Sequence, residues 1–390
     1  MKDNKKDKKN IKRRKKAPGA ILLPVFSVIL AGAAVIILLA MSGSSAGSGF
    51  GDYLASFGNG SGYPVNVDKT ETVSTKRIGS GIMLLSNDSV EILNSTAKEV
   101  VRVQHTFLNP ESDIANGRAI IYSRSSGRVE VIHRSGVLYK TDLEKNILTA
   151  SVGKKGNIAI ASKSISAQSD LTVLDKKGKT IFSWECAAER ISAVALSGNG
   201  KSVAVAVVGA ENTELYSRVL VFNFDKSVPV VEFKYPENAM IKLKFGSNDT
   251  LIAIGDKMFS AISVKENTKQ DVEHDAGDVL ERFYTYENGK TALVLSPFGN
   301  KMLSKLVVYS PTGKLLFETN CKQEVKWVTC DTNYVVVLTE DEVQCFDNTG
   351  SLMGSFKVDK YAESVVVVGK HTYLFEKGLI TQYNTVGLSR

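Results

Sequence analysis

A short strand–turn–strand pattern returns along most of the chain at intervals near 40 residues. Its clearest copy is QCFDNTGSL (344–352), in which Asp347, Asn348 and Gly350 form a tight turn, because Asn, Asp and Gly tolerate left-handed backbone dihedrals. The spacings between copies are 39, 42, 50, 40, 45, 37 and 37 residues, and the positions equivalent to Gly350 are Ala97, Gly136, Gly178, Val228, Thr268, Gly313 and Gly387. Repeats of this length with short strands predict a β-propeller, since helical repeats would show 3.6-residue periodicity.

Between these turns, apolar runs of strand length are broken by Gly, Asn, Asp and Lys. The clearest four-stranded blade is 190–236, with strands RISAVALS, KSVAVAVV, SRVLVFNF and VPVVEFKY. The predicted fold class is therefore all-β, a propeller of four-stranded blades. We expect the innermost strand of each blade to be the most buried, with Ala193, Val194 and Ala195 packed where the blades converge.

The two ends of the repeat region determine the number of blades. After Gly350 the sequence supplies three strands, AESVVVV, HTYLF and LITQY, and it reaches Arg390 before a fourth. The segment YPVNV (63–67) is a spare strand, and its pairing with the last blade would close the ring and remove exposed strand edges. This favours eight blades in 63–390, closed by strand 63–67. Seven blades is the alternative, if residues 239–275, the poorest unit, are not a true blade.

The first 62 residues differ from the repeats in composition. Residues 1–16 hold ten Lys or Arg and two Asp, so they carry the whole formal charge of +8. Residues 17–41 are uncharged and long enough to cross a lipid bilayer as a transmembrane helix, and 42–62 are a Gly/Ser-rich linker. The positive-inside rule predicts a single-pass protein of the cell membrane, with a cytoplasmic basic arm and an extracytoplasmic propeller. A cleaved signal peptide is the alternative.

No stretch carries an interpretable motif for catalysis, a metal or a cofactor. GNGKS (198–202) lacks the first Gly of a phosphate-binding loop and precedes a strand where that loop needs a helix. The histidines are isolated in the sequence: His105, His133, His274 and His371. The cysteines show no CxxC spacing, which leaves disulfides or buried thiols open for Cys186, Cys321, Cys330 and Cys345. We predict no cofactor, no catalytic or metal residue, and packing roles for Trp184 and Trp327.

Three connections between second and third strands are unusually long: 162–169, 209–217 and 296–304. They emerge on one face of a propeller, and loops on a rigid scaffold are the usual place for binding. The candidate partner-binding residues are Glu211, Tyr216, Phe298 and Lys301, with neutral insertions as the alternative. Because residues 17–390 have no net charge, nucleic acid is not an expected partner. We predict a binding or scaffold module for a protein or a cell-envelope polymer. The alternative is a cell-surface enzyme or sensor with its site at the central channel.

The chain resembles a family of uncharacterised Gram-positive bacterial membrane proteins that is defined by a domain of unknown function. The matching segments are the basic-then-apolar start, the linker, YPV (63–65), LNPESDIANGRAIIYSRSSGRVEV (108–131) and ISAVALSGNGKSVAV (191–205). The resemblance implies a single-pass protein with an external propeller and brings no activity or catalytic residue. The segment GKTIFSW (178–184) is more distantly similar to quinoprotein-type propellers, although their periodic Trp pattern is absent here.

Overall fold

The computed structural model describes residues 58–67 and 72–387. The chain divides into two units, 1–54 and 55–390, and all described residues belong to the second. The predicted arm (1–16), the predicted span (17–41) and the linker up to residue 57 lie outside the described residues. Within the described part, no helix is long and apolar enough to cross a membrane.

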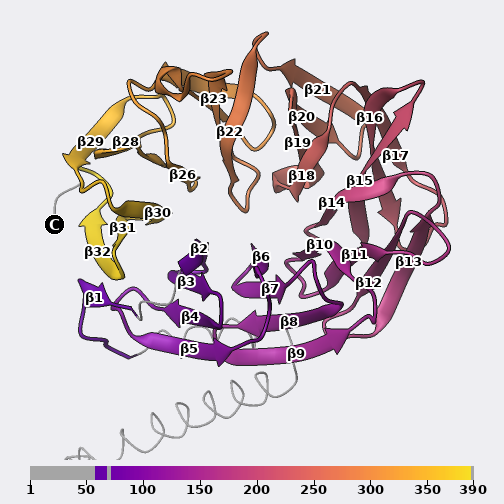
Figure 1. Ribbon diagram of the computed structural model, residues 1–390, viewed down its shortest axis with the longest axis horizontal. Coiled ribbons are helices and arrows are strands. Elements are labelled where there is room, and N and C mark those ends of the chain that lie inside the picture. Colours follow the sequence, from indigo (N-terminus) through magenta and orange to yellow (C-terminus); the bar gives the residue numbers. More distant parts are fainter. Residues whose placement is uncertain (1–57, 68–71, 388–390) are drawn as a thin grey trace, which may run out of the picture. The chain divides into compact units, whose positions relative to one another are not determined.

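The described strands pair into eight antiparallel four-stranded sheets, which stand around a central axis as the blades of a propeller (Figure 1). Blade 1 consists of β2 (Thr72–Ile78), β3 (Gly81–Ser86), β4 (Ser89–Leu93) and β5 (Glu99–Gln104), and blade 2 of β6 (Glu111–Ala115), β7 (Arg118–Tyr122), β8 (Arg128–His133) and β9 (Gly136–Asp142). Blade 3 consists of β10 (Ile147–Val152), β11 (Ile158–Lys163), β12 (Ser169–Leu174) and β13 (Thr180–Cys186), and blade 4 of β14 (Arg190–Leu196), β15 (Ser202–Glu211), β16 (Glu214–Asn223) and β17 (Val231–Pro236).

The second half of the ring repeats this plan. Blade 5 consists of β18 (Met240–Phe245), β19 (Thr250–Gly255), β20 (Met258–Ser263) and β21 (Thr268–Glu273), and blade 6 of β22 (Asp278–Thr285), β23 (Thr291–Pro297), β24 (Lys305–Tyr309) and β25 (Leu315–Asn320). Blade 7 consists of β26 (Trp327–Cys330), β27 (Val335–Leu338), β28 (Glu342–Phe346) and β29 (Leu352–Lys357), and blade 8 of β30 (Ala362–Val368), β31 (His371–Glu376), β32 (Leu379–Asn384) and β1 (Val65–Asn66). The predicted eight-bladed propeller is confirmed, and the seven-bladed alternative is wrong because residues 239–275 contain a complete blade.

The last blade closes the ring with a strand from the start of the described chain. In β1, Val65 pairs with Ile380 and Asn66 with Leu379 on β32. The closing strand is thus two residues long, shorter than the segment 63–67 from which it was predicted. Tyr63, just before it, donates a hydrogen bond from its hydroxyl to the Asn94 carbonyl of blade 1 at 2.9 Å.

The turn that defines the repeat joins the third and fourth strands in blades 1–7 and follows the third strand in blade 8. Its aligned position has a positive φ in most copies: Ala97 (62°), Gly136 (124°), Gly178 (83°), Gly313 (85°), Gly350 (81°) and Gly387 (75°). In blade 5 the left-handed residue is Asn267, at 51°, one position before the predicted Thr268. Val228 is not left-handed, because it precedes Pro229 and a residue before proline is restricted to extended conformations.

Each of the eight hydrophobic clusters lies between two neighbouring blades. Successive strand residues point to opposite faces of their sheet, so Val203 and Val205 on β15 pack toward blade 3, whereas Ala204 and Ala206 pack toward blade 5. The cluster between blades 8 and 1 contains Ile82 and Tyr373 among others and completes the circle. Both faces of every sheet are therefore buried.

The expectation that the innermost strand is the most buried one in each blade is wrong for blade 6. In blade 6, all residues of β23 except Pro297 are buried, while no residue of the innermost strand β22 is. The innermost strand has a free edge toward the axis, so only part of its surface is covered by neighbours. Ala193, Val194 and Ala195 are themselves buried, as predicted.

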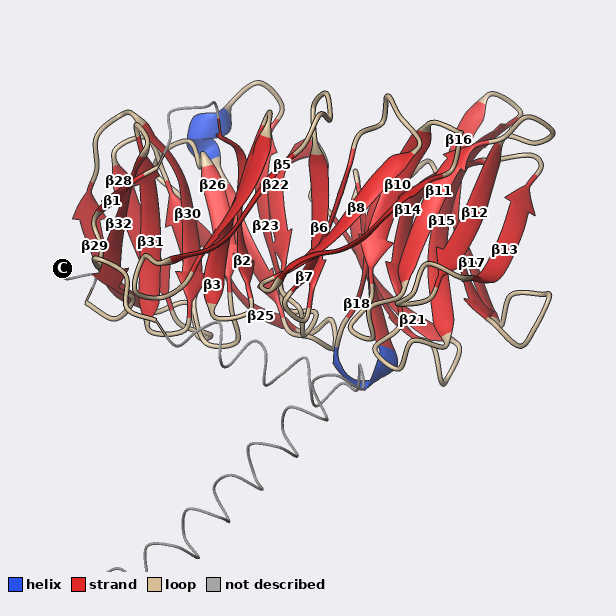
Figure 2. Cartoon of the chain, turned by 90° about the horizontal axis from the view of Figure 1, so that it is seen from below, coloured by secondary structure: helices blue, strands red, loops and turns tan. Residues whose placement is uncertain are grey.

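The antiparallel order places the connections on two opposite faces. Connections between second and third strands, and between blades, form one face, which we call the loop face. Connections between first and second strands, and between third and fourth strands, form the other, the turn face. Figure 2 shows the two short 3-10 helices on opposite faces: η2 (Lys301–Leu303) follows a second strand, and η1 (Ser247–Asp249) follows a first strand.

We predict that Gly313→Ala destabilises the fold more than Gly299→Ala does. A Cβ at Gly313 would lie 2.3 Å from the Cβ of Ala261 on the preceding blade, whereas nothing lies within 4 Å of one at Gly299. The two glycines have similar φ, 85° and 78°, so the backbone cost of adding a Cβ largely cancels. The difference in unfolding free energy, measured by urea denaturation, should be about 1–3 kcal/mol, the usual effect of overpacking. Equal losses would contradict the close blade contact at Gly313.

Candidate functional site

The predicted connection 209–217 is an extension of two strands and not a loop. β15 and β16 continue to Glu211 and Glu214, and Asn212 and Thr213 form a two-residue turn with φ of 50° and 71°. Both values match the turn type that fits the right-handed twist of a hairpin. The long segment therefore projects from blade 4 as a hairpin on the loop face.

Glu211 and Tyr216 lie together on this hairpin, and both contact Lys234 of the adjacent strand β17. The Lys234 ammonium group is 2.6 Å from a Glu211 carboxylate oxygen and 4.4 Å from the centre of the Tyr216 ring. The Tyr216 hydroxyl donates a hydrogen bond to buried Glu189 at 3.1 Å. Both candidate residues already interact with neighbouring side chains, and their role in partner binding stays a prediction.

Phe298 and Lys301 lie in the other kind of connection, an irregular loop of blade 6 that contains η2. The Lys301 ammonium group is 3.0 Å from Glu281 and 3.8 Å from Glu324. Phe298 is 87% exposed, and its neighbours Leu303 and Met302 are 62% and 50% exposed. This loop thus presents three large apolar side chains to solvent within six residues.

Two further exposed apolar residues on the loop face were not among the predicted candidates. Ile165 lies in the second-to-third-strand connection of blade 3 and is 92% exposed, and Leu108 lies between blades 1 and 2 and is 72% exposed. Ile165 could have been found, because it is the one large apolar residue within the long connection SKSISAQS.

The central channel was the alternative site. A cavity of about 330 Å³ lies there, lined by the innermost strands of blades 1, 2, 5, 6 and 7 and by the turn after β22. Its lining residues are Thr75, Lys76, Arg77, Asp113, Ile114, Lys242, Lys244, Arg282, Phe283, Tyr284, Thr285, Tyr286, Glu287, Trp327 and Val328. We call this space the central cavity. Sequence reasoning named none of these residues as binding candidates.

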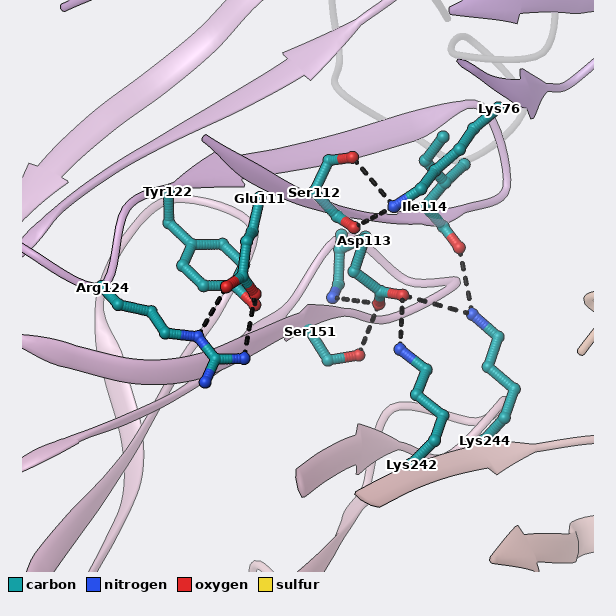
Figure 3. Close-up of polar contacts among 11 residues, drawn as sticks. Lys76, Glu111, Ser112, Asp113, Ile114, Tyr122, Arg124, Ser151, Lys242 and Lys244 are labelled. Carbon is teal, nitrogen blue, oxygen red and sulfur yellow. Dashed lines mark hydrogen bonds and ion pairs between the residues drawn. The ribbon is translucent and has the colours of Figure 1, made fainter. Parts of the chain in front are cut away.

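Three lysines and one carboxylate lie close together in one part of the cavity wall (Figure 3). One oxygen of Asp113 accepts hydrogen bonds from the Ser151 hydroxyl at 2.6 Å and from the Val152 amide at 3.1 Å. Its other oxygen lies 3.5 Å from the Lys242 ammonium group and 3.8 Å from that of Lys244. The blade 2 carboxylate is thus shared between two cations of blade 5.

The third lysine has no carboxylate partner among the described residues. The Lys76 ammonium group donates to the Ser112 carbonyl at 2.5 Å and to the Ser112 hydroxyl at 3.1 Å. Burial and the nearby Lys242 ammonium group lower the pKa of Lys76 to about 8. The carboxylate of Glu111, on the same strand as Ser112, is held by Arg124 and by the Tyr122 hydroxyl (Figure 3).

Several contacts cross the ring between blades that are far apart in sequence. The Lys244 ammonium group donates to the Ile114 carbonyl at 3.0 Å. The Asn116 amide donates to Glu287 at 3.2 Å. These contacts join blade 2 to blades 5 and 6, so the cavity has a defined wall on the turn-face side.

The cysteines and histidines form no obvious reactive group. Cys186, Cys321, Cys330 and Cys345 are all free and buried, and burial raises the pKa of Cys321 to about 11. Within residues 58–67 and 72–387, no three His, Cys, Asp or Glu side chains are grouped so that they could hold a metal ion. Trp184 packs on Phe222, with ring centres 4.9 Å apart.

Comparison with known proteins identifies a family and a fold. A model described as a family of unknown function (DUF5711) matches residues 62–382. No curated protein matches the sequence significantly. The expected membership of a domain-of-unknown-function family with a β-propeller fold is confirmed, whereas a Gram-positive origin and a single membrane pass stay predictions.

Among solved structures, the chain is similar to BamB from Moraxella catarrhalis, with 13% identity over 83% of this chain and 100% of that one and a TM-score of 0.52. It is also similar to the C-terminal WD40 domain of Sif2, with 11% identity over 82% and 98% of the two chains and a TM-score of 0.57. A third is Chaetomium thermophilum Sqt1 bound to the N-terminus of ribosomal protein L10, with 11% identity over 82% and 98% and a TM-score of 0.54. At these identities the likeness shows the fold alone.

We predict that Asp113→Asn destabilises the protein and that the effect depends on pH. Burial alone would raise the pKa of the Asp113 carboxyl, but the Lys244 and Lys242 ammonium groups outweigh it and hold that pKa below its ordinary value. At pH 7 the variant should lose about 2–3 kcal/mol of unfolding free energy, because the buried carboxylate that compensates the lysines is removed. The loss is limited because Lys242 remains partly solvated.

The pH dependence of the stability lost in Asp113→Asn shows whether the loss comes from the charge of the carboxylate or from the change of side chain alone. An unfolded Asp ionises near pH 4, so the depressed folded pKa contributes stability above that pH and loses it as the pH falls further. The stability difference between wild type and Asp113→Asn should shrink between pH 5 and pH 3 in urea titrations. A difference that stays constant with pH would show that the charge of Asp113 is irrelevant.

Proposed function

We propose, from the premise that this chain belongs to the DUF5711 family of unknown function, that it is a binding module whose loop face docks a protein partner. The fold is a closed ring in which every blade is fixed by two neighbours. Such a ring holds its connections in fixed positions, and binding residues commonly lie on loops held by a rigid scaffold.

The observation that carries the proposal is the exposed apolar group on the blade 6 loop. Phe298, Met302 and Leu303 are each at least half exposed, although nothing in a closed propeller requires large apolar residues there. Grouped exposed apolar side chains mark interaction sites on soluble domains, and aromatic and Met residues are enriched at protein interfaces. Lys301 beside them would contribute a charged rim.

The likeness to Sqt1 supports a protein partner in general terms. In its solved structure, Sqt1 is bound to the N-terminus of the ribosomal protein L10. A protein of similar fold can therefore take a protein segment as ligand, although the shared fold assigns no particular partner to this chain. A cell-envelope polymer remains the alternative ligand.

The proposed setting is the outer side of a cell membrane, with residues 17–41 as the anchor. Support comes from the charge distribution: ten basic residues precede the uncharged stretch, and none follows it before Lys69. Under the positive-inside rule, this asymmetry orients the propeller outward.

We predict that the triple change Phe298→Ser, Met302→Ser and Leu303→Ser abolishes partner capture. The test is cross-linking on intact cells that produce the full-length chain, followed by pull-down. The removed side chains are exposed, so stability should change by less than about 1 kcal/mol, which circular dichroism and thermal melting will check. Loss of one specific cross-linked protein is the expected result.

The matched control makes the same kind of change away from the loop face. Val228, Leu315 and Leu352 lie at third-to-fourth-strand turns or just after them, and all are exposed; their triple change to Ser should leave capture intact. Equal capture by the loop-face variant and by wild type would refute the assignment of the blade 6 loop. Capture of a polysaccharide without any protein would favour the polymer alternative.

We predict that Lys357→Cys is labelled by a membrane-impermeant maleimide in intact cells, whereas Lys8→Cys is labelled only after lysis. All four native cysteines are buried, so each introduced cysteine is the reactive one. Lys357 is exposed on the outermost strand of blade 7, and Lys8 lies in the predicted cytoplasmic arm. The reverse labelling pattern would contradict the proposed orientation.

A further inference from the structure

The wall of the central cavity has more positive than negative charge. Five lining residues are cationic, namely Lys76, Arg77, Lys242, Lys244 and Arg282. Two are anionic, Asp113 and Glu287. The formal charge of the lining is thus +3. This excess is local, because residues 17–390 taken together have no net charge.

The carboxylate at the centre of the lysines cannot neutralise all of them. One oxygen of Asp113 is occupied by Ser151 and Val152, which leaves one oxygen for Lys242 and Lys244 at 3.5 and 3.8 Å. These separations are longer than the roughly 2.8 Å of a close charge-assisted hydrogen bond. Lys76 donates hydrogen bonds only to Ser112 within the described part of the chain, and its lowered pKa reflects burial first and then the nearby Lys242 ammonium group.

Aromatic side chains lie beside the cations in the same cavity. Tyr284 and Tyr286 come from blade 6 and Trp327 from blade 7. The Arg77 guanidinium is 5.1 Å from the centre of the Tyr286 ring. Known small-molecule sites combine an apolar or aromatic wall with a few placed charges in a volume of about 300–1,000 Å³, and this cavity lies at the lower end of that range.

We propose that the central cavity binds a small organic anion, with a phosphate or carboxylate group at Lys76, Lys242 and Lys244 and a ring against the aromatic wall. Lys242 and Lys244 share one oxygen of Asp113, and Lys76 donates to Ser112 alone among the described residues. An added anion would therefore give each of the three ammonium groups a charged acceptor. The limited volume selects a single-ring ligand over a polymer. This inference is independent of the loop face, because none of the cavity residues belongs to the blade 6 loop.

The first test is calorimetric titration of the purified full-length chain with phenyl phosphate in a phosphate-free buffer. Benzylamine, which carries the same kind of ring and a positive charge, is the control probe. We expect binding of phenyl phosphate and none of benzylamine. Absence of phenyl phosphate binding at millimolar concentration, or equal binding of both probes, overturns the inference.

Variants assign the binding to the cavity. Lys242→Gln should weaken phenyl phosphate binding about tenfold or more, the effect of losing one charge-assisted contact. Lys357→Gln makes the same change of charge on the outermost strand of blade 7, where Lys357 pairs with Asp341 at 2.8 Å, and should leave affinity unchanged. Equal weakening in both variants, or none in either, overturns the assignment.

A fluorescence measurement keeps the test valid if Lys242→Gln lowers the melting temperature. The chain has two tryptophans, and Trp184→Phe leaves Trp327 of the cavity wall as the only tryptophan, whose emission is then followed. A ring bound at this wall should quench or shift the Trp327 emission in proportion to the calorimetric saturation. Saturation without any change in Trp327 emission places the ligand elsewhere and overturns the inference.

Discussion

Each blade buries both faces of its sheet against its neighbours, and the rest of the structure depends on this two-sided burial. On β15 the alternating residues supply two different interfaces, Val203 and Val205 toward blade 3 and Ala204 and Ala206 toward blade 5. A blade with one neighbour would leave such a face in water, at a cost of about 1.5–3 kcal/mol for each large apolar side chain. The eight interfaces are complete only in a closed ring, which explains why β1 returns to pair with β32.

The innermost strand of each blade is less strictly bound by this requirement for two-sided burial. Their free edge faces the axis, so they tolerate residues that the second strands exclude. On β18 (MIKLKF), Lys242 and Lys244 are two positions apart and therefore point the same way, toward Asp113. A lysine on β19, the second strand of the same blade, would place its ammonium group between two apolar sheets, where the cost of desolvating it would be uncompensated. The axis-facing strands are thus where this fold can carry several charges at its centre.

The repeat pattern predicted the fold because its signals are local. The turn at Gly350 needs a left-handed residue whatever the rest of the chain does, and the same position is left-handed at Ala97. The cavity could not be predicted in this way, because Lys76, Asp113 and Lys242 meet only after the ring closes and no sequence spacing encodes their contact. Two of the cavity lysines, Lys242 and Lys244, lie in the first strand of residues 239–275, the unit that was predicted to be the poorest blade. Departures from a local rule often mark functional positions.

The charges of the cavity are difficult to explain as a device for stability. Buried ion pairs are on average no more stabilising than apolar residues of similar volume, and three lysines around one carboxylate include repulsion between cations. Burial first, and then the Lys242 ammonium group, lowers the pKa of Lys76, so its charged form is less favourable here than in water. An apolar set of side chains, as in the eight interfaces between blades, would fill the centre of the ring without that repulsion. An anion placed among the lysines would convert the repulsion into attraction, so the arrangement is better explained by recognition than by folding.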